Sequence, residues 1–352
     1  MALDPVPWFI GGAAEHSAEA ARNIAWNATQ GRTGVANPSS LKVSQLATAG
    51  GGVRVSPGGG AIESTYPGAT QQSYTVRNDA SETVSVPANT GTSTITRYVV
   101  VRVSDPQYAG SAPPNPVVGP YVSFQVVSSL SSVHPQLALA RLRIPPSTSV
   151  ITSSMIQDER TLLNPRKEDL IFARPRLFLD QAGDLEREMF LNRRTVSNGF
   201  GNAGGEYFPG GSGSPNQVSM TIPAWANRML IEADWMSVRY HPGKQVQGFY
   251  WVEFGDEYRG HEGWHGTNQW EFKTEAFFFD GANHNTNSWT RTNWRLMEER
   301  AVPAKLKGVE ATFVFKGALS ASADTNGVSM TGRSGLGLRV TFAEESAGNR
   351  MI

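Results

Sequence analysis

His261-Glu262-Gly263-Trp264-His265 is the part of this sequence whose residue types and spacing could do catalytic chemistry. It matches H-E-x-x-H, in which two histidines one helical turn apart bind zinc while the glutamate activates the metal-bound water. That arrangement requires a helix, and Gly260, Gly263 and Gly266 each disfavour a helix by about 1 kcal/mol relative to alanine. The sequence therefore predicts a chance match in a glycine-rich loop.

The residues around this motif leave two lesser alternatives. Only His284 follows as a later histidine, and it does not stand at a spacing that would supply a third zinc ligand. A non-catalytic metal site on Asp256, Glu257 or His265 and a metal-dependent hydrolase using His261, Glu262 and His265 remain open. Our prediction is no catalytic residue, no metal and no cofactor.

Aromatic residues crowd the same region, since seven of the nine tryptophans lie between Trp225 and Trp294. Indole faces stack on sugar rings, and glycines let a backbone approach a ligand closely. We therefore predict that the loop between residues 258 and 270 forms a surface that binds a glycan or a partner protein. A subunit interface and an ordinary hydrophobic core are the alternatives for these aromatics. The candidate contacts are Tyr258, His261, Trp264, His265 and Trp270.

Composition excludes several functional classes. The 352 residues carry a formal net charge of +0, so we expect no nucleic-acid partner, which would favour a basic excess. Cysteine is absent, which excludes disulfides and thiolate sites. No run of about 18 apolar residues occurs, so we expect no membrane insertion. The N-terminal residues do not resemble a signal peptide.

The elements that must position these residues are mostly strands. Alternating apolar residues recur from Lys42 to Ile144 and again from Val218 to the C-terminus, and the whole chain contains 36 glycines and 21 prolines, which favour turns between short strands. We predict a mainly β chain. Residues 1–165 would form a helix plus a small β-barrel or sandwich, residues 166–215 an extended Gly/Pro-rich connector, and residues 216–352 a jelly-roll-like antiparallel β-sandwich.

One helix is expected between Ala13 and Gln30, capped by Ser17 and ended at Gly31. Alanines dominate its apolar stripe, so it permits close approach, either to its own strands or to a symmetry mate. The apolar segment before it would also be covered on assembly. The candidate assembly interface therefore comprises Pro7, Trp8, Phe9, Ile10, Ala21, Ile24, Ala25 and Ala28.

The first half also contains a series of segments whose order is informative. GVANPSSLKV and GGVRVSPGGGAI follow the helix, and then come YTVRND, VVVRVSDPQYAG and LALARLRIPPSTSVITSSMIQDER. This series resembles a module near the N-terminus of minor tail and upper-baseplate (tail-tip) proteins of long-tailed, siphovirus-type bacteriophages. The resemblance covers roughly residues 1–165. Where that family has an Asp-Leu-Arg-Pro-like element, this chain has Asp158-Glu159-Arg160, which leaves the exit path of the chain open.

The resemblance implies a structural virion protein of the tail tip or baseplate, made in the host cytoplasm. It implies a module that docks on other tail-tip proteins, a homotrimer, and a C-terminal β-domain that contacts host surface polysaccharide. Such a protein is not an enzyme. The alternative from another class is a non-viral, lectin-like carbohydrate-binding module.

Overall fold

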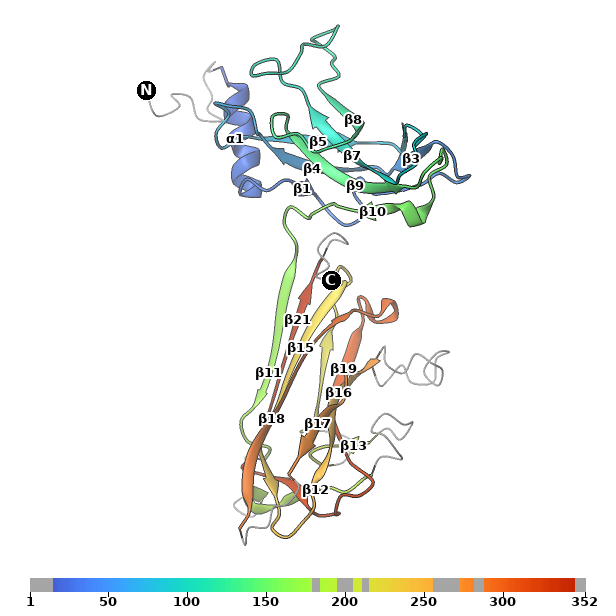
Figure 1. The fold of residues 1–352 in the computed structure, drawn as a ribbon. Coiled ribbons are helices and arrows are strands. Elements are labelled where there is room, and N and C mark those ends of the chain that lie inside the picture. Colours follow the sequence, from blue (N-terminus) through green and yellow to red (C-terminus); the bar gives the residue numbers. More distant parts are fainter. Residues whose placement is uncertain are drawn as a thin grey trace. The chain divides into compact units, whose positions relative to one another are not determined.

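The protein is described by a computed structural model that covers residues 15–178, 184–194, 205–210, 215–255, 272–281 and 288–345. The chain divides into two compact units (Figure 1), the first ending at Pro165 and the second spanning Arg166–Glu344. Each unit has its own hydrophobic core. The fold is mainly β with one N-terminal helix, as the sequence predicts.

Helix α1 (Ala18–Thr29) begins and ends where its sequence signals lie. The Ser17 hydroxyl accepts a hydrogen bond from the Ala20 amide at 3.1 Å, and Glu19 lies in the first turn. Gln30 and Gly31 both have positive φ, which stops the helix. The helix therefore begins directly after its predicted cap, Ser17, and lies within the predicted range from Ala13 to Gln30.

The first unit contains three antiparallel sheets, with orders β1-β4-β5, β2-β3-β6 and β10-β9-β7-β8. The first two are built from β1 (Gly34–Val35), β2 (Val43–Gln45), β3 (Gly52–Val55), β4 (Gly58–Glu63), β5 (Ser73–Asn78) and β6 (Glu82–Ser85). The third contains β7 (Ile95–Val103), β8 (Val122–Val127), β9 (Gln136–Ile144) and β10 (Ile156–Asp158). A short 3-10 turn occupies Ser153–Met155, directly before β10.

The centre of the first unit is the pair β7–β9. Val99, Val100 and Val101 are all buried, as expected of a strand covered on both faces. On β9, Leu137 and Leu139 are buried, Ala138 between them is only half-buried, and Ala140 is buried again. The pairing of β7 with β9 shifts register between Val99 and Val100, and this irregularity moves the buried face to Leu137 and Leu139 before Ala140.

The prediction that residues 166–215 form an extended connector between two domains is wrong. Its described residues include β11 (Lys167–Arg174), β12 (Glu188–Leu191) and β13 (Glu206–Tyr207), which pair with β21, β20 and β19 of the second unit. Half-buried Leu170 and Phe172 pack on the core of that unit. The second unit therefore begins at Arg166 because these strands bury apolar side chains in it.

The strands in the described residues of the second unit, β11 to β13 included, form two antiparallel sheets. One has the order β11-β21-β15-β20-β12 with β18 also on β15, and the other has the order β13-β19-β16-β17 with β14 also on β19. The other strands are β14 (Gln217–Thr221), β15 (Arg228–Tyr240), β16 (Gln247–Phe254), β17 (Phe277–Asp280), β18 (Thr290–Ala301), β19 (Glu310–Leu319), β20 (Val328–Thr331) and β21 (Gly335–Ala343), with 3-10 turns at Asp184–Glu186 and Ala304–Leu306.

Aromatic side chains from the two sheets meet in the core of this sandwich. Trp235 on β15 is fully buried, as its alternation with Met229, Ile231 and Ala233 predicts. Its ring lies 4.9 Å from Phe315 and 5.2 Å from Tyr250, measured between ring centroids. These edge-on contacts join the six-stranded sheet to the five-stranded sheet, which makes the unit a β-sandwich.

A charged pair closes the end of the second unit where its chain enters. Arg166 donates through Nε and Nη2 to the two carboxylate oxygens of Glu344, at 2.9 and 2.8 Å. The Glu344 amide donates back to the Arg166 carbonyl at 2.9 Å. This hydrogen bonding and the Arg166 charge hold the pKa of Glu344 below its usual range.

Candidate functional site: a groove beside helix α1

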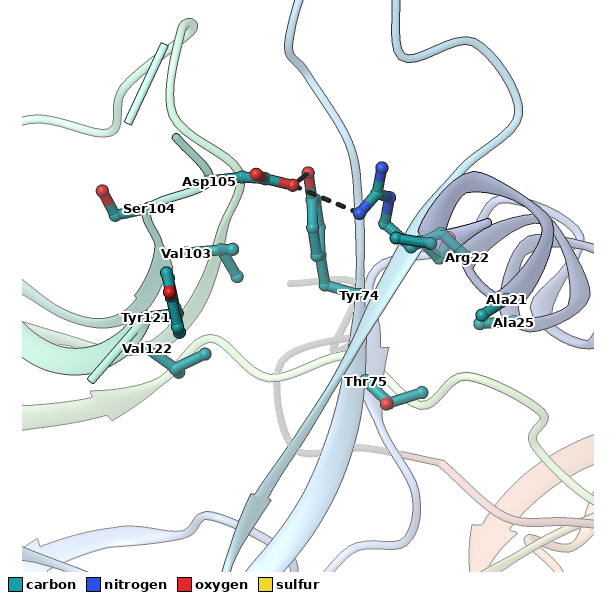
Figure 2. Close-up of a pocket in the computed structure, with 12 residues that line it drawn as sticks. Ala21, Arg22, Ala25, Tyr74, Thr75, Val103, Ser104, Asp105, Tyr121 and Val122 are labelled. Carbon is teal, nitrogen blue, oxygen red and sulfur yellow. Dashed lines mark hydrogen bonds and ion pairs between the residues drawn. The ribbon is translucent and has the colours of Figure 1, made fainter. Parts of the chain in front are cut away.

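The first unit has a groove of about 440 Å³ between helix α1, strand β5 and the β7–β8 connection (Figure 2). The helix contributes Ala18, Ala21, Arg22 and Ala25 to its wall. Because alanine side chains are short, the backbone of a partner could approach the helix closely along this side of the groove. The strands contribute Ser73, Tyr74, Thr75, Val103, Ser104, Asp105, Tyr121 and Val122.

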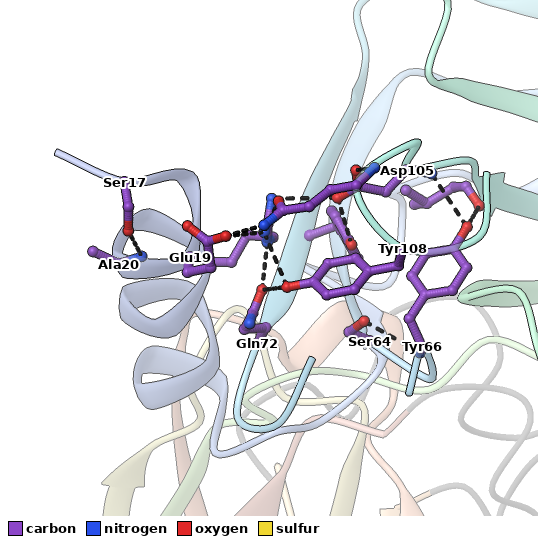
Figure 3. Close-up of polar contacts among 12 residues, drawn as sticks. Ser17, Glu19, Ala20, Ser64, Tyr66, Gln72, Asp105 and Tyr108 are labelled. Atoms are coloured by element: carbon purple, nitrogen blue, oxygen red, sulfur yellow. Dashed lines mark hydrogen bonds and ion pairs between the residues drawn. The ribbon is translucent and has the colours of Figure 1, made fainter. Parts of the chain in front are cut away.

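Arg22 lies at the polar end of the groove (Figure 2), and three of its partners, Gln72, Asp105 and Tyr108, are labelled in Figure 3. Its guanidinium lies 3.3 Å from the Asp105 carboxylate and donates to Gln72 at 2.6 Å and to the Tyr108 hydroxyl at 3.3 Å. It also lies over the Tyr74 and Tyr108 rings, 5.4 and 5.6 Å from their centroids. With 13% of its side chain exposed, Arg22 fastens the helix to the strands and the loops between them.

Asp105 is held by the tight turn at Asp105-Pro106. Its carboxylate accepts from the Gln107 amide at 2.9 Å and from the Tyr74 hydroxyl at 2.8 Å, while its carbonyl accepts from the amides of Tyr108 and Gly110. A side chain at Gly110 would come within 2.4 Å of the Asp105 nitrogen, so this turn requires glycine.

The charged and polar groups of the groove are paired with one another. Burial, and next the hydrogen bond to Asp105, raise the pKa of Tyr74 well above its usual value. Tyr74 therefore remains a neutral donor at physiological pH. Each of Arg22, Tyr74 and Asp105 is already engaged in structural contacts, and the described lining holds no serine or tyrosine paired with a histidine base.

A second hollow, of about 350 Å³, shares Val122 with the groove and follows the same two strands. It is lined by Val76 and Arg77 of β5 and by Ser123 and Phe124 of β8. Within the described residues, β5 pairs with β4 and β8 pairs with β7, each along one edge. The first unit is therefore open along a β5–β8 seam.

The structure places only part of the predicted assembly interface in the groove. Ala21 and Ala25 line it, whereas Ile24, 39% exposed, and Ala28, also exposed, are not among its lining residues. Pro7, Trp8, Phe9 and Ile10 lie outside the described residues.

The predicted glycan or partner loop cannot be placed either. Tyr258, His261, Trp264, His265 and Trp270 all lie outside the described residues, and so does the whole H-E-x-x-H motif. Across the described part of the chain, no three His, Asp or Glu side chains are grouped so that they could hold a metal ion. No helix in that part is long and apolar enough to span a bilayer.

Arg22, Tyr74 and Asp105 were not among the residues predicted from the sequence. Their partners lie tens of residues apart, since Arg22 and Asp105 are brought together only by the fold. The available signal was the SDPQY segment after a buried strand, in which an Asp-Pro turn positions both a carboxylate and a tyrosine.

Comparisons with known proteins give distant structural likenesses. No family model matches the chain, and no curated protein matches its sequence. Dimeric latent PorU from Porphyromonas gingivalis aligns at 11% identity and TM-score 0.24, over 89% of this chain and 26% of that one. The glycosylasparaginase PNGase F from Flavobacterium meningosepticum aligns at 8% identity and TM-score 0.23, over 75% and 88%.

A viral capsid protein is among the similar structures. The VP2 subviral particle of infectious bursal disease virus aligns at 10% identity and TM-score 0.25, over 91% of this chain and 69% of that one. These weak neighbours therefore include both enzymes and a virion protein. TM-scores this low assign neither a function nor a shared ancestry.

Proposed function

We propose that this chain is a non-enzymatic structural component of a phage tail tip or baseplate. Its first unit docks into the particle as a homotrimer, and its second unit is displayed and contacts host surface glycans. The sequence resemblance over residues 1–165 supports this proposal. The main structural observation in its favour is the groove beside α1, because the predicted interface residues Ala21 and Ala25 line it.

The surface of the first unit supports a role in assembly. Val117 and Val118 are 92% and 79% exposed in the connection that leads into β8, and Ile24 is exposed on the helix. Apolar side chains in water and unpaired strand edges are both stabilised when another chain covers them. A surface that combines them with the alanine wall fits a second copy of this chain.

Sizing by light scattering tests the trimer directly. We expect the purified protein to have three times the mass of one chain, and Ala25→Arg to shift it toward the monomer because a long charged side chain fills the groove. Ala301→Arg is the matched control, since Ala301 is exposed on β18 of the second unit. A monomeric wild-type protein at assembly concentrations would contradict the trimer.

Antibody labelling of purified particles tests the virion assignment. Label at one end of the tail is the expected result. Label confined to cells, with none on particles, would favour the lectin-like alternative and remove the tail-tip proposal.

A further inference from the structure

The outer face of the six-stranded sheet carries a polar cluster at its β12–β20–β15–β18 end. Pairing puts Phe190 opposite Ser329, Ser329 opposite Arg239, and Arg239 opposite Arg291, in one row across four strands. Tyr240, the next residue on β15, packs in the sandwich core, so this row faces the other way. Yet Arg239 is 5% exposed and Ser329 is fully buried.

Arg239 is held in place beneath an exposed indole. Its Nη1 lies 3.0 Å from the Glu188 carboxylate, and its Nη2 lies 3.7 Å from that of Glu186. Its guanidinium carbon lies 4.5 Å from the centroid of the Trp289 ring, while its own Nε is buried without a hydrogen-bond partner. Trp289 is 53% exposed, so part of the indole that Arg239 does not cover is accessible to a ligand.

Positive charge exceeds negative charge around this tryptophan. Arg291 stands directly across the strand from Arg239 and donates to the Ser237 hydroxyl at 2.7 Å. Arg333 is 60% exposed and pairs with Glu186 at 2.8 Å. The cluster thus contains three guanidiniums and two carboxylates. While His241 is neutral, its net charge is one positive charge; the groups counted are Arg239, Arg291, Arg333, Glu186 and Glu188.

The state of Arg291 agrees with a cationic surface. Burial, and next the charge of Arg239, lower the pKa of Arg291; Arg333 acts in the same direction, and Glu186 and Glu188 oppose them. An added carboxylate would relieve this repulsion. Guanidinium groups bind carboxylates with two parallel hydrogen bonds, and indole faces stack on the apolar faces of sugar rings.

We propose that this surface binds an acidic sugar, with the ring on the exposed part of the Trp289 indole and the carboxylate on the guanidiniums of Arg291 and Arg333. The site deepens the glycan-contact part of the proposed function and does not depend on docking into a particle. A neutral sugar of the same ring type would keep the stacking and lose the ion pairs. The preference for carboxylated sugars is therefore the signature of the site.

Calorimetric titration of the full chain tests the site with three probes. They are an oligogalacturonate, the neutral galacto-oligosaccharide of equal length, and a poly-glutamate of matched charge. We expect the oligogalacturonate to bind at least tenfold more tightly than either of the others. Equal binding of poly-glutamate would show general attraction of anions, and absence of oligogalacturonate binding would also overturn the proposal.

Substitutions assign the binding to named residues. Trp289→Ala should weaken oligogalacturonate binding tenfold or more, and Arg291→Ala should remove the preference over the neutral sugar. Phe278→Ala is the matched control, because Phe278 is a 54% exposed aromatic on β17 of the other sheet. Unchanged binding in Trp289→Ala, or an equal loss in Phe278→Ala, would overturn the site.

Two further measurements distinguish a direct loss of sugar contacts from unfolding of the variant. Melting curves of all variants show whether a loss of binding reflects unfolding, and Arg333→Ala, at an exposed position, repeats the charge test without altering the core. Particle labelling reports on docking independently. Failure of the unaltered protein to bind the acidic sugar, together with intact virion incorporation, would refute this site and leave the structural role in place.

Discussion

Arg22 is the residue that connects helix α1 to the strands and to their connecting loops. It contacts Gln72, Asp105 and Tyr108 with little solvent exposure. We expect Arg22→Met to lower the free energy of unfolding of the first unit by about 1–3 kcal/mol, because it leaves the Asp105 carboxylate without its cation. Denaturant unfolding followed by circular dichroism measures this change.

Arg143→Met is the control for that substitution. Arg143 is exposed on β9, so its replacement should change the free energy of unfolding by no more than about 0.5 kcal/mol. Equal losses in the two variants would mean that the Arg22 contacts do not stabilise the helix.

His241 gives the second unit a predicted acid sensitivity. Its Nε2 lies 2.9 Å from the Ser329 hydroxyl and 3.5 Å from the Glu188 carboxylate, and the Phe190 and Trp289 rings lie beside it. Burial is the main reason that its pKa falls below 6.5, with Arg239 and Lys244 acting in the same direction and Glu188 opposing them.

A lowered folded-state pKa means that the unfolded chain binds the proton more readily. The stability that neutral His241 contributes is therefore complete above about pH 6.5 and is lost as the pH falls through the folded-state pKa. We expect melting temperatures to decline below pH 6.5 and His241→Gln to decline less steeply. Parallel pH profiles for the two proteins would contradict this assignment.

At the scale of elements, the pairing of β1 with β4 depends on glycine. Gly60 lies opposite Val35, and an added Cβ would come within 2.5 Å of the Gly34 carbonyl oxygen. The Gly34 carbonyl belongs to the backbone and cannot rotate away as a side chain could. Gly60→Ala must therefore move β4 away from β1. We expect a loss of about 1–3 kcal/mol in the free energy of unfolding.

Gly50→Ala is the matched substitution for Gly60→Ala. The nearest heavy atom to its added Cβ lies 3.7 Å away, and Gly50 is not among the positive-φ glycines. We expect no loss here, and a gain of about 0.4–1 kcal/mol from the stiffer unfolded chain. If both alanines destabilised equally, the close approach of β1 and β4 would not be the cause.

At the scale of the whole molecule, the two cores share no residue. The core of the second unit runs from Leu177 to Phe342, and that of the first from Val35 to Leu162. We therefore expect a fragment of residues 166–345 to fold independently and to keep its near-ultraviolet circular dichroism, which reports the packing of Trp235 and Trp294. A fragment with a flat near-ultraviolet spectrum would show that the second unit needs the first.

The sequence predicts those features that depend on local periodicity. Burial of Trp235 follows from two-residue alternation, and the start of α1 follows from the Ser17 cap. Within the candidate groove, helical spacing alone identifies Ala21 and Ala25. These features need no knowledge of distant contacts.

Features that depend on pairing between distant segments could not be predicted. The register shift at Val99 moves the buried face of β9, and nothing in the local pattern marks it. The strand Lys167–Arg174 leaves Ile171 72% exposed, so its apolar residues do not form one clean face. Arg22 and Asp105 meet only after the whole first unit has folded.

The ion pair between Arg166 and Glu344 has a mechanical consequence. Tension on the chain at Pro165 reaches β11 first, and β11 is paired with β21 in register from Lys167 to Arg174. When the sandwich is held at the far end of β11, this tension loads the ladder in shear, so its hydrogen bonds share the force. Peeling would have to begin at Lys167, next to the two-pronged contact of Arg166 with Glu344. The contact between Arg166 and Glu344 therefore stands where tension at Pro165 would first act on the paired strands.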